Sequence, residues 1–226
     1  MNAEEIVNRL LYRDALMLVI DKPAGLPVHP GPKGGETLFH HLDALRFGLP
    51  RRPEAAHRLD KDTSGCLVLG RHPKAIARLN ELFRKGEVDK VYWAVVEGGP
   101  QDDEGEIDLA LAPKSPDRGW WMKVDPKGQP SLTTWRVMGR GEGLCLLELR
   151  PVTGRTHQLR VHCAAMNFPI LGDPIYGTAP RFHGPGLHLH ARSVSVPLYP
   201  KKPPITVEAP VPEHMRERVS MCGGGV

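Results

Sequence analysis

Residues 57–65 read HRLDKDTSG and lead directly into the apolar run CLVLGR at residues 66–71. The second segment has the composition of a buried strand, and the first ends in Thr-Ser-Gly, which is typical of a turn. The turn segment holds an imidazole, a guanidinium, an ammonium and two carboxylates within nine positions. Which of these charges performs chemistry depends on what the rest of the chain supplies.

The 226-residue chain has the composition of a soluble globular protein, with 40% hydrophobic and 25% charged residues. It is long enough to bury a substantial core without disulfides or metal sites. The 24 glycines and 23 prolines indicate many turns and short strands, so an all-helical fold is excluded. We expect a single compact domain over residues 1–226.

The cysteines show no CxxC spacing, and no apolar N-terminal segment with a cleavage site directs the chain to an oxidising compartment. No apolar run approaches the roughly 20 residues that cross a bilayer. We therefore expect a cytoplasmic protein with reduced thiols, at Cys66, Cys145, Cys163 and Cys222.

The charge pattern permits a polyanionic partner without requiring one, because the formal net charge is +4. Residues 150–162 carry Arg150, Arg155 and Arg160 and no acidic residue, and residues 71–90 are also rich in lysine and arginine. Both segments are candidates for phosphate contacts, although such clusters are more often solvated surfaces.

Apolar patterns predict strands at residues 15–21, 66–71, 90–98 and 144–150 and helices at 37–48, 73–86 and 155–167. In the third strand the period of two places Tyr92, Ala94 and Val96 on one face. Residues 101–130 are polar and interrupted by Pro and Gly, which indicates a hairpin-like excursion. The irregular mixture predicts an α+β fold on a mixed, mainly antiparallel sheet flanked by helices and loops.

In the last predicted helix, helical spacing separates two sets of side chains. One side carries His157, Arg160 and Ala164, and the other carries Leu159, His162, Cys163 and Met166.

The segment HRLDKDTSG resembles the signature of the RluA-type pseudouridine synthases. A lone HRLD is weak evidence, but six segments agree in order across about three-quarters of the chain. The others are DKPAGLPVHPG (21–31), KVYWAVVEG (90–98), GRTHQLRVH (154–162), GDPIYG (172–177) and LHLHA (187–191).

The resemblance implies isomerisation of uridine in structured RNA. The bond from N1 of uracil to C1′ of ribose breaks, and the base is rejoined through C5. It also implies the pseudouridine synthase catalytic fold around a central cleft, no cofactor and no metal. The family's catalytic residues map to Asp60, Tyr92 and Arg160.

These residue types suit the reaction that the resemblance implies. Detaching uracil leaves an electron-poor sugar carbon, so Asp60 is able to act as nucleophile, charge stabiliser or base, and the sequence does not choose among them. Arg160 is the expected counter-charge, because a guanidinium grips a carboxylate with two parallel hydrogen bonds. Stacking on uracil is the simpler role for Tyr92, and proton removal at C5 is the bolder one.

A uridine inside folded RNA has to be flipped out before it reacts, at a cost of a few kcal/mol. We expect His57, Arg58 and Thr63 to hold the flipped nucleotide. Arg155 and His157 are further candidates for substrate binding, with Arg155 contacting phosphate or capping the helix. Lys61 and Asp62 are expected to face water.

Many relatives carry a small N-terminal RNA-binding domain called S4. Only about 14 residues precede the first predicted strand, so we expect no S4 domain here. Target choice then rests on loops of the catalytic domain, with ribosomal RNA, transfer RNA or both as substrates. Trp120 and Trp121 are candidates for base stacking or for packing on the core. One site per chain makes a monomer without an obligatory protein partner sufficient.

Two alternatives belong to other functional classes. An inactive RNA-binding module of the same fold is disfavoured, because a pure binder does not need Asp60, Tyr92 and Arg160 together. A metal-dependent hydrolase would use imidazole ligands and would be sensitive to a chelator. Its candidate ligands match no standard zinc spacing and are His157, His162, His183, His188 and His190.

Overall fold

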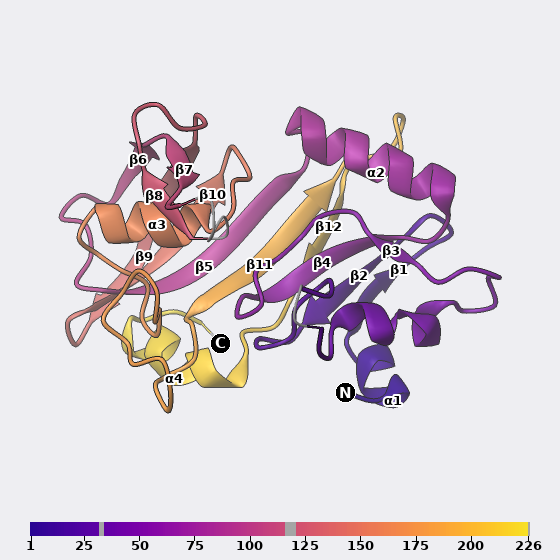
Figure 1. Ribbon diagram of the computed structural model, residues 1–226, viewed down its shortest axis with the longest axis horizontal. Helices are drawn as coiled ribbons and strands as arrows, with labels where there is room; N and C mark the ends of the chain where they lie inside the picture. Colours follow the sequence, from indigo (N-terminus) through magenta and orange to yellow (C-terminus); the bar gives the residue numbers. More distant parts are fainter. Residues whose placement is uncertain (32–33, 116–120, 226) are drawn as a thin grey trace. The chain divides into compact units, whose positions relative to one another are not determined.

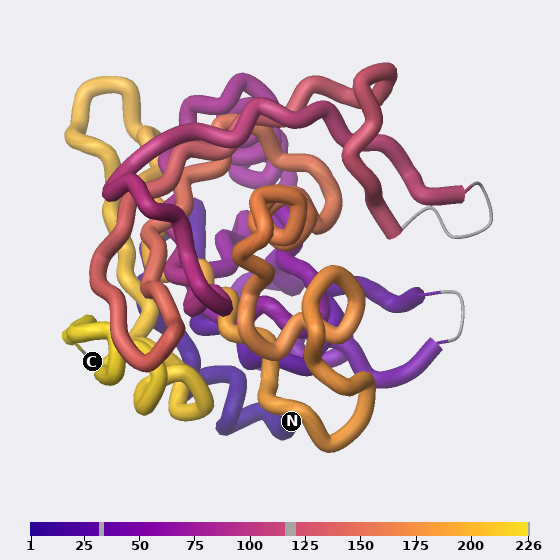
Figure 2. The backbone as a smooth tube through the Cα atoms, turned by 90° about the vertical axis from the view of Figure 1, so that its left-hand side faces the viewer, coloured from indigo at the N-terminus to yellow at the C-terminus, as the bar shows by residue number. Residues whose placement is uncertain are grey.

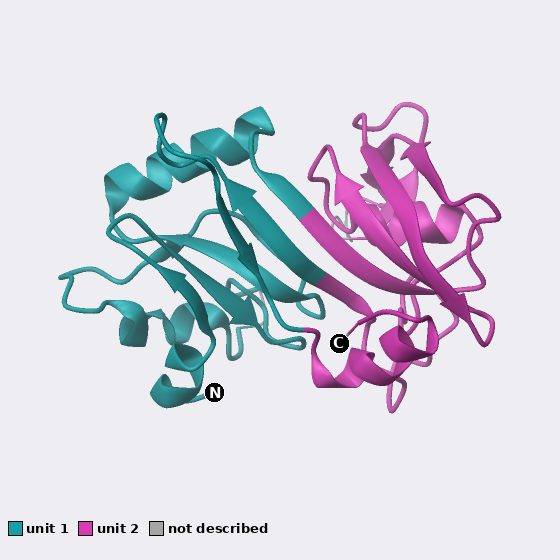
Figure 3. Cartoon of the chain, turned by 180° about the vertical axis from the view of Figure 1, so that it is seen from behind, with its two compact units in different colours: residues 1–90, 191–210 teal, residues 91–190, 211–226 magenta. Residues whose placement is uncertain are grey.

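The computed structural model of the chain describes residues 1–31, 34–115 and 121–225. These residues form two compact units, each assembled from separated parts of the chain. Unit 1 comprises residues 1–90 and 191–210, and unit 2 comprises residues 91–190 and 211–226 (Figure 3). The chain passes from unit 1 to unit 2 within strand β5 (Asp89–Glu97) and returns to unit 1 within strand β11 (Leu189–Val196). It enters unit 2 again after residue 210.

Unit 1 is built on antiparallel strand pairs. Strand β2 (Met17–Lys22) lies between β1 (Leu10–Arg13) and β4 (Ser64–Gly70), and β4 is also hydrogen-bonded to β11. The short β3 (Glu54–Ala55) pairs with β4, and β12 (Ile205–Glu208) pairs with β11. Strand β4 is buried along its whole length, as expected for the run that follows the charged turn.

Helix α2 (Pro73–Lys85) packs its apolar stripe on these strands. It begins with Pro73 after His72, whose ring accepts a hydrogen bond from the Ala75 amide, and it ends at Gly86 in the left-handed region, with φ of 72°. These start and stop signals are the ones that the sequence displays, and the predicted helix is confirmed. Unit 1 also contains the short α-helix α1 (Ala3–Val7) near the N-terminus.

The helix predicted over residues 37–48 is wrong in type. The structure has two short 3₁₀ helices, η1 (Leu38–His40) and η2 (Leu42–Leu45). Phe47 and Gly48 both adopt positive φ, 46° and 83°, which ends helical structure after η2.

Unit 2 contains an antiparallel sheet in the order β5-β10-β9-β6 (Figure 1). Strands β9 (Leu132–Gly141) and β10 (Leu144–Pro151) form a hairpin whose connecting residues, Glu142 and Gly143, both have positive φ. Strand β6 (Glu104–Asp108) pairs with β9. Two helices cover opposite faces: α3 (Gln158–Ala165) packs over Ala94 and Leu147, and α4 (Glu213–Met221) packs over Val95 and Leu146.

Between β6 and β9 the chain makes a separate hairpin of β7 (Leu111–Pro113) and β8 (Met122–Val124) (Figure 2). The predicted excursion at residues 101–130 therefore contains both this hairpin and a strand of the main sheet. Trp120, one of the two candidate stacking residues, lies outside the described residues.

The predicted α+β class with a mainly antiparallel sheet is confirmed. The central cleft and the single domain over residues 1–226 stay predictions. In the described part of the chain, no helix is long and apolar enough to cross a membrane. All four cysteines are buried free thiols, as the spacing predicts.

Candidate functional site

Asp60 lies on a tight turn at the entrance to β4. The Thr63 amide donates to the Asp60 carbonyl oxygen at 3.2 Å, which closes the turn. The side chain of Asp60 is partly buried. The sequence folds this way because β4 starts immediately afterwards and has its partner β2 alongside, with Lys22 opposite Gly65 in the register.

Lys22, at the end of β2, is the buried cation of this region and is fully inaccessible to solvent. Its ammonium donates to three backbone carbonyls: Pro23 at 2.8 Å, Leu26 at 2.9 Å and Lys61 at 3.1 Å. The ammonium therefore joins the loop after β2 to the turn that carries Asp60. Burial lowers the pKa of Lys22 to about 8, although the negative charges of Asp62, Asp60 and Asp21 oppose the shift.

His57 is partly buried, and its ring packs into unit 1. Its Nε2 accepts a hydrogen bond from the Val68 amide at 3.0 Å, and its ring stacks on Phe83 with centroids 4.4 Å apart. Burial, with a smaller contribution from Lys90, lowers its pKa to about 3, so the ring is neutral at physiological pH. That His57 holds the flipped nucleotide stays a prediction; in this structure its ring contacts Val68 of β4 and Phe83 of α2.

The neighbours of Asp60 differ in exposure. Arg58 and Lys61 are exposed, and Asp62 is partly buried. The Thr63 side chain is only 2% exposed, and among the described residues its hydroxyl has no hydrogen-bond partner. A buried hydroxyl without a partner is costly unless a ligand or water satisfies it. Arg58 and Thr63 thus keep the features that substrate contacts need.

Tyr92 belongs to unit 2 and lies on β5 opposite Leu149 of β10. Its partly buried ring packs against the cluster that contains Ala94 and Val96. The face assignment from the strand period is therefore confirmed. Trp93, on the other face, packs with Val95.

Arg160, on α3, is 3% exposed and forms a two-bond ion pair with Asp173. Nε donates to one carboxylate oxygen at 2.7 Å and Nη2 to the other at 2.8 Å. Burial would raise the pKa of Asp173, but the hydrogen bonds and charge of Arg160, with the amides of Ile175 and Tyr176, lower it overall. Two of the three guanidinium nitrogens are thus used by Asp173, and the expected pairing of Arg160 with Asp60 stays a prediction.

His157 precedes α3 rather than lying within it. The helix begins at Gln158, and His157 has a left-handed backbone with φ of 53°. Its Nδ1 lies 2.8 Å from the Tyr176 hydroxyl. Arg155 is exposed, and its Nε donates to the Pro130 carbonyl at 3.2 Å.

The two sides predicted for this helix are only partly right. Leu159 and Cys163 are in the core, as predicted. Met166 is 42% exposed, because the helix has already ended at Ala165.

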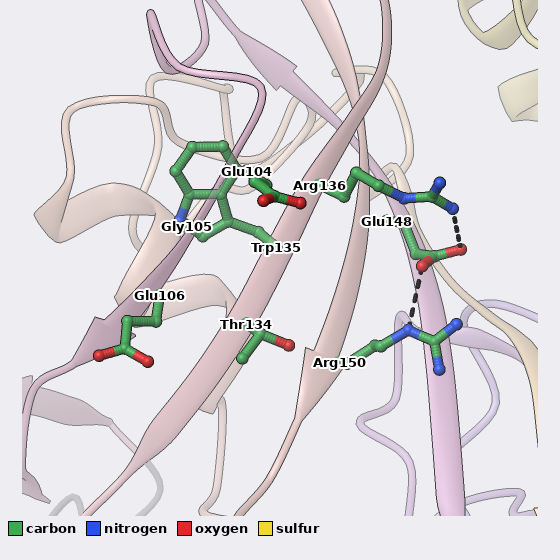
Figure 4. A pocket seen from close by; sticks show the side chains of 8 residues that line it. All are labelled: Glu104, Gly105, Glu106, Thr134, Trp135, Arg136, Glu148 and Arg150. Atoms are coloured by element: carbon green, nitrogen blue, oxygen red, sulfur yellow. Dashed lines mark hydrogen bonds and ion pairs between the residues drawn. The ribbon is translucent and has the colours of Figure 1, made fainter.

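A surface hollow over β6, β9 and β10 contains one predicted phosphate contact, Arg150, and none of the predicted catalytic residues (Figure 4). Glu148 lies between two arginines, with its carboxylate 3.4 Å from Arg136 and 3.0 Å from Arg150. Glu104 and Glu106 add further negative charge. This balance of charge does not favour a phosphate, so the hollow is not assigned to RNA binding.

Histidines proposed as metal ligands have other partners. His162 is buried between the Thr133 hydroxyl and the Leu109 carbonyl, both at 3.0 Å. His188 lies 2.7 Å from the Gly186 carbonyl. Within residues 1–31, 34–115 and 121–225, no three His, Cys, Asp or Glu side chains are grouped as metal ligands would be.

Comparison with known proteins identifies the family. A family model described as RNA pseudouridylate synthase matches residues 16–165, more than half of the chain. An uncharacterised RNA pseudouridine synthase of Zymomonas mobilis is 47% identical over 210 residues, which cover 92% of this chain and 95% of that protein. The chain belongs to the RNA pseudouridylate synthase family.

Further relatives of this pseudouridine synthase agree. The structure of human RNA pseudouridylate synthase domain containing 4 superposes with a TM-score of 0.82 at 28% identity, covering 98% of this chain and 95% of that one. Ribosomal large subunit pseudouridine synthase D of Borreliella burgdorferi is 35% identical over 176 residues, 74% of this chain and 54% of that protein. The chain is therefore an RNA isomerase of the RluA type.

Sequence reasoning missed three residues that support the candidate site: Lys22, Asp173 and Tyr176. Each lies in a segment that already carries the family resemblance, DKPAGLPVHPG or GDPIYG. The sequence shows these segments, but it does not show that the Lys22 ammonium contacts the Asp60 turn or that the Asp173 carboxylate pairs with Arg160.

Proposed function

We propose that this pseudouridine synthase isomerises specific uridines in structured ribosomal or transfer RNA, with Asp60 acting at or next to C1′ of the flipped nucleotide. The name of the Borreliella burgdorferi relative, which refers to the large ribosomal subunit, supports ribosomal RNA as one substrate. No cofactor takes part in the proposed reaction, because the base leaves and rejoins the same sugar.

The observation that carries the proposal is the setting of Asp60. Its turn is fixed through Lys61, whose carbonyl accepts hydrogen bonds from both the Lys22 ammonium and the Gly25 amide. A carboxylate on a backbone fixed in this way keeps its position when a nucleotide approaches, which is what covalent or electrostatic catalysis requires.

The other residues take supporting roles in the proposal. Tyr92 stacks on the detached uracil, and Arg160 supplies positive charge for the reaction. Arg58, exposed beside the Asp60 turn, and the buried Thr63 hydroxyl contact the flipped nucleotide. Arg155 and His157 contact the RNA at the start of α3.

A tritium-release assay tests the proposal. Rejoining through C5 expels the hydrogen on that carbon, so ribosomal and transfer RNA transcripts made with uridine tritiated at C5 report each turnover as tritium in water. Asp60→Asn removes the charge and little of the shape, so we expect less than about 1% of wild-type turnover with RNA affinity within about tenfold. Asp62→Asn, the same change two positions away, is the matched control and retains most activity.

Two outcomes would contradict the proposal in different ways. Asp60→Asn turnover above about 1% would remove Asp60 from the reaction. Wild-type enzyme that releases no tritium from either class of transcript would reject the proposed substrates. Mapping pseudouridines in total RNA from cells with and without the protein identifies the uridine.

A further inference from the structure

We propose that Tyr176 is a positioning residue for Arg160. Its hydroxyl is hydrogen-bonded to the β7–β8 hairpin, so the position of the arginine side chain depends on that hairpin. The inference rests on the proposed function, which gives Arg160 a part in the reaction. All the residues involved belong to unit 2.

The first link is between Tyr176 and Arg160. The Cζ atom of Arg160 lies 5.3 Å from the centroid of the Tyr176 ring, within the range of a cation–π contact. The Tyr176 amide donates to Asp173 Oδ1 at 3.0 Å, and the same oxygen accepts from Arg160 Nη2. Ring and backbone of Tyr176 are therefore both fixed to the ion pair that holds the arginine.

The second link is between Tyr176 and the hairpin. The amide of Met122, the first residue of β8, donates to the Tyr176 hydroxyl oxygen at 2.9 Å. This hydrogen bond joins positions 54 residues apart in the chain. It fixes the tyrosine from the side opposite to its backbone.

The third link is to His157. Because the hydroxyl oxygen accepts from Met122, its own proton is available for Nδ1 of His157 at 2.8 Å. The two rings meet edge to face, with centroids 5.6 Å apart. His157 also has a left-handed backbone, and such strain persists only where the surroundings fix it. The Tyr176 hydroxyl is thus hydrogen-bonded both to the hairpin and to the residue before α3, the helix that carries Arg160.

The Tyr176→Phe variant isolates this hydroxyl, since the ring stays over the guanidinium. We expect the single-turnover rate of tritium release at saturating RNA to fall about tenfold or more, while the dissociation constant for RNA changes less than about threefold. Tyr199→Phe is the matched control, because its hydroxyl also makes a 2.9 Å hydrogen bond, to Asp14 in unit 1. The control should keep the wild-type rate within about twofold.

A second measurement does not depend on activity. Hydrogen exchange of the Arg160 Nε proton, followed by NMR and assigned by its loss in Arg160→Lys, reports how firmly the arginine is held. We expect exchange at least about tenfold faster in Tyr176→Phe and unchanged in Tyr199→Phe.

Unchanged exchange in Tyr176→Phe, an unchanged saturating rate, or a loss confined to RNA affinity would each overturn the inference. Failure of the wild-type enzyme to release tritium would instead count against the proposed function, and the exchange result would still decide whether Tyr176 positions Arg160.

Discussion

Arg160 and Asp173 hold each other in a buried ion pair, with side chains only 3% and 1% exposed and two hydrogen bonds of 2.7 and 2.8 Å. Neither charge would be stable at this depth alone, because desolvation of an isolated ion is costly. Asp173 is further satisfied by the amides of Ile175 and Tyr176. The pair therefore fixes the first turn of α3 to the loop that follows this helix.

Asp173→Ala should be strongly destabilising, because it leaves the guanidinium of Arg160 buried without its counter-charge. We expect a loss of about 3–5 kcal/mol in the free energy of unfolding, measured by urea denaturation. Asp103→Ala is the matched control: Asp103 is 85% exposed and pairs with Arg140 at 2.9 Å. That change should cost less than about 1 kcal/mol. Similar small losses in both variants would show that the buried pair contributes little.

Arg160→Lys tests whether the geometry of the guanidinium matters for turnover. An ammonium keeps the charge but does not reproduce the two parallel bonds to Asp173. We expect the rate of tritium release to fall about a hundredfold. Arg136→Lys changes an arginine that is 57% exposed and pairs with Glu148, and it should keep near-normal activity. Normal turnover in Arg160→Lys would show that no such pairing is needed.

His57 should make stability depend on acid pH. Its pKa is lowered from 6.5 to about 3 in the folded protein, chiefly by burial. Between these values the unfolded chain binds a proton that the folded protein excludes, so stability is lost as the pH falls through this window.

His57→Gln is the variant for this test, because its amide oxygen is able to accept the Val68 N–H in place of Nε2. On going from pH 7.5 to 4.5 in urea denaturation, wild type should lose about 2–3 kcal/mol more than the variant. Equal losses would mean that the ring is protonated in the folded state.

Local signals explain which elements the sequence predicts well. The strand β4 follows from a short apolar run after a turn, and α2 follows from Pro73 at its start and Gly86 at its end. Residues 37–48 have helical spacing, but their stop signal is a left-handed Phe47, which is not recognisable from residue type. The two units were also not predicted, because each is assembled from distant segments.

The residues of the candidate site also differ in how much of their setting the sequence predicts. The family resemblance points to Asp60 and Tyr92 through their motifs, and the strand period adds the face on which Tyr92 lies, which the structure confirms. Arg160 is different: the sequence analysis expects it to oppose the charge of Asp60, and spacing along the chain gives no sign of its pair with Asp173. Asp173 lies 13 residues away and becomes the partner only through the fold. His57 has a partner that its place in the motif does not reveal, since its Nε2 accepts from the Val68 amide of β4.

Gly65, the last residue of the motif, should be intolerant of any side chain. It has φ of 104°, and a Cβ there would collide with the carbonyl of Ala191 on β11, whose backbone lies against it. Gly65→Ala therefore combines backbone strain with overpacking, and we expect a loss of about 3 kcal/mol or more in urea denaturation.

Gly86→Ala separates the two effects. Gly86 also has positive φ, 72°, but nothing lies within 4 Å of a Cβ there. That variant should lose only about 1 kcal/mol, the cost of the left-handed backbone alone. If both variants lost the same amount, β11 would have room to move away from Gly65, and the motif glycine would be explained by its conformation rather than by the close contact with Ala191.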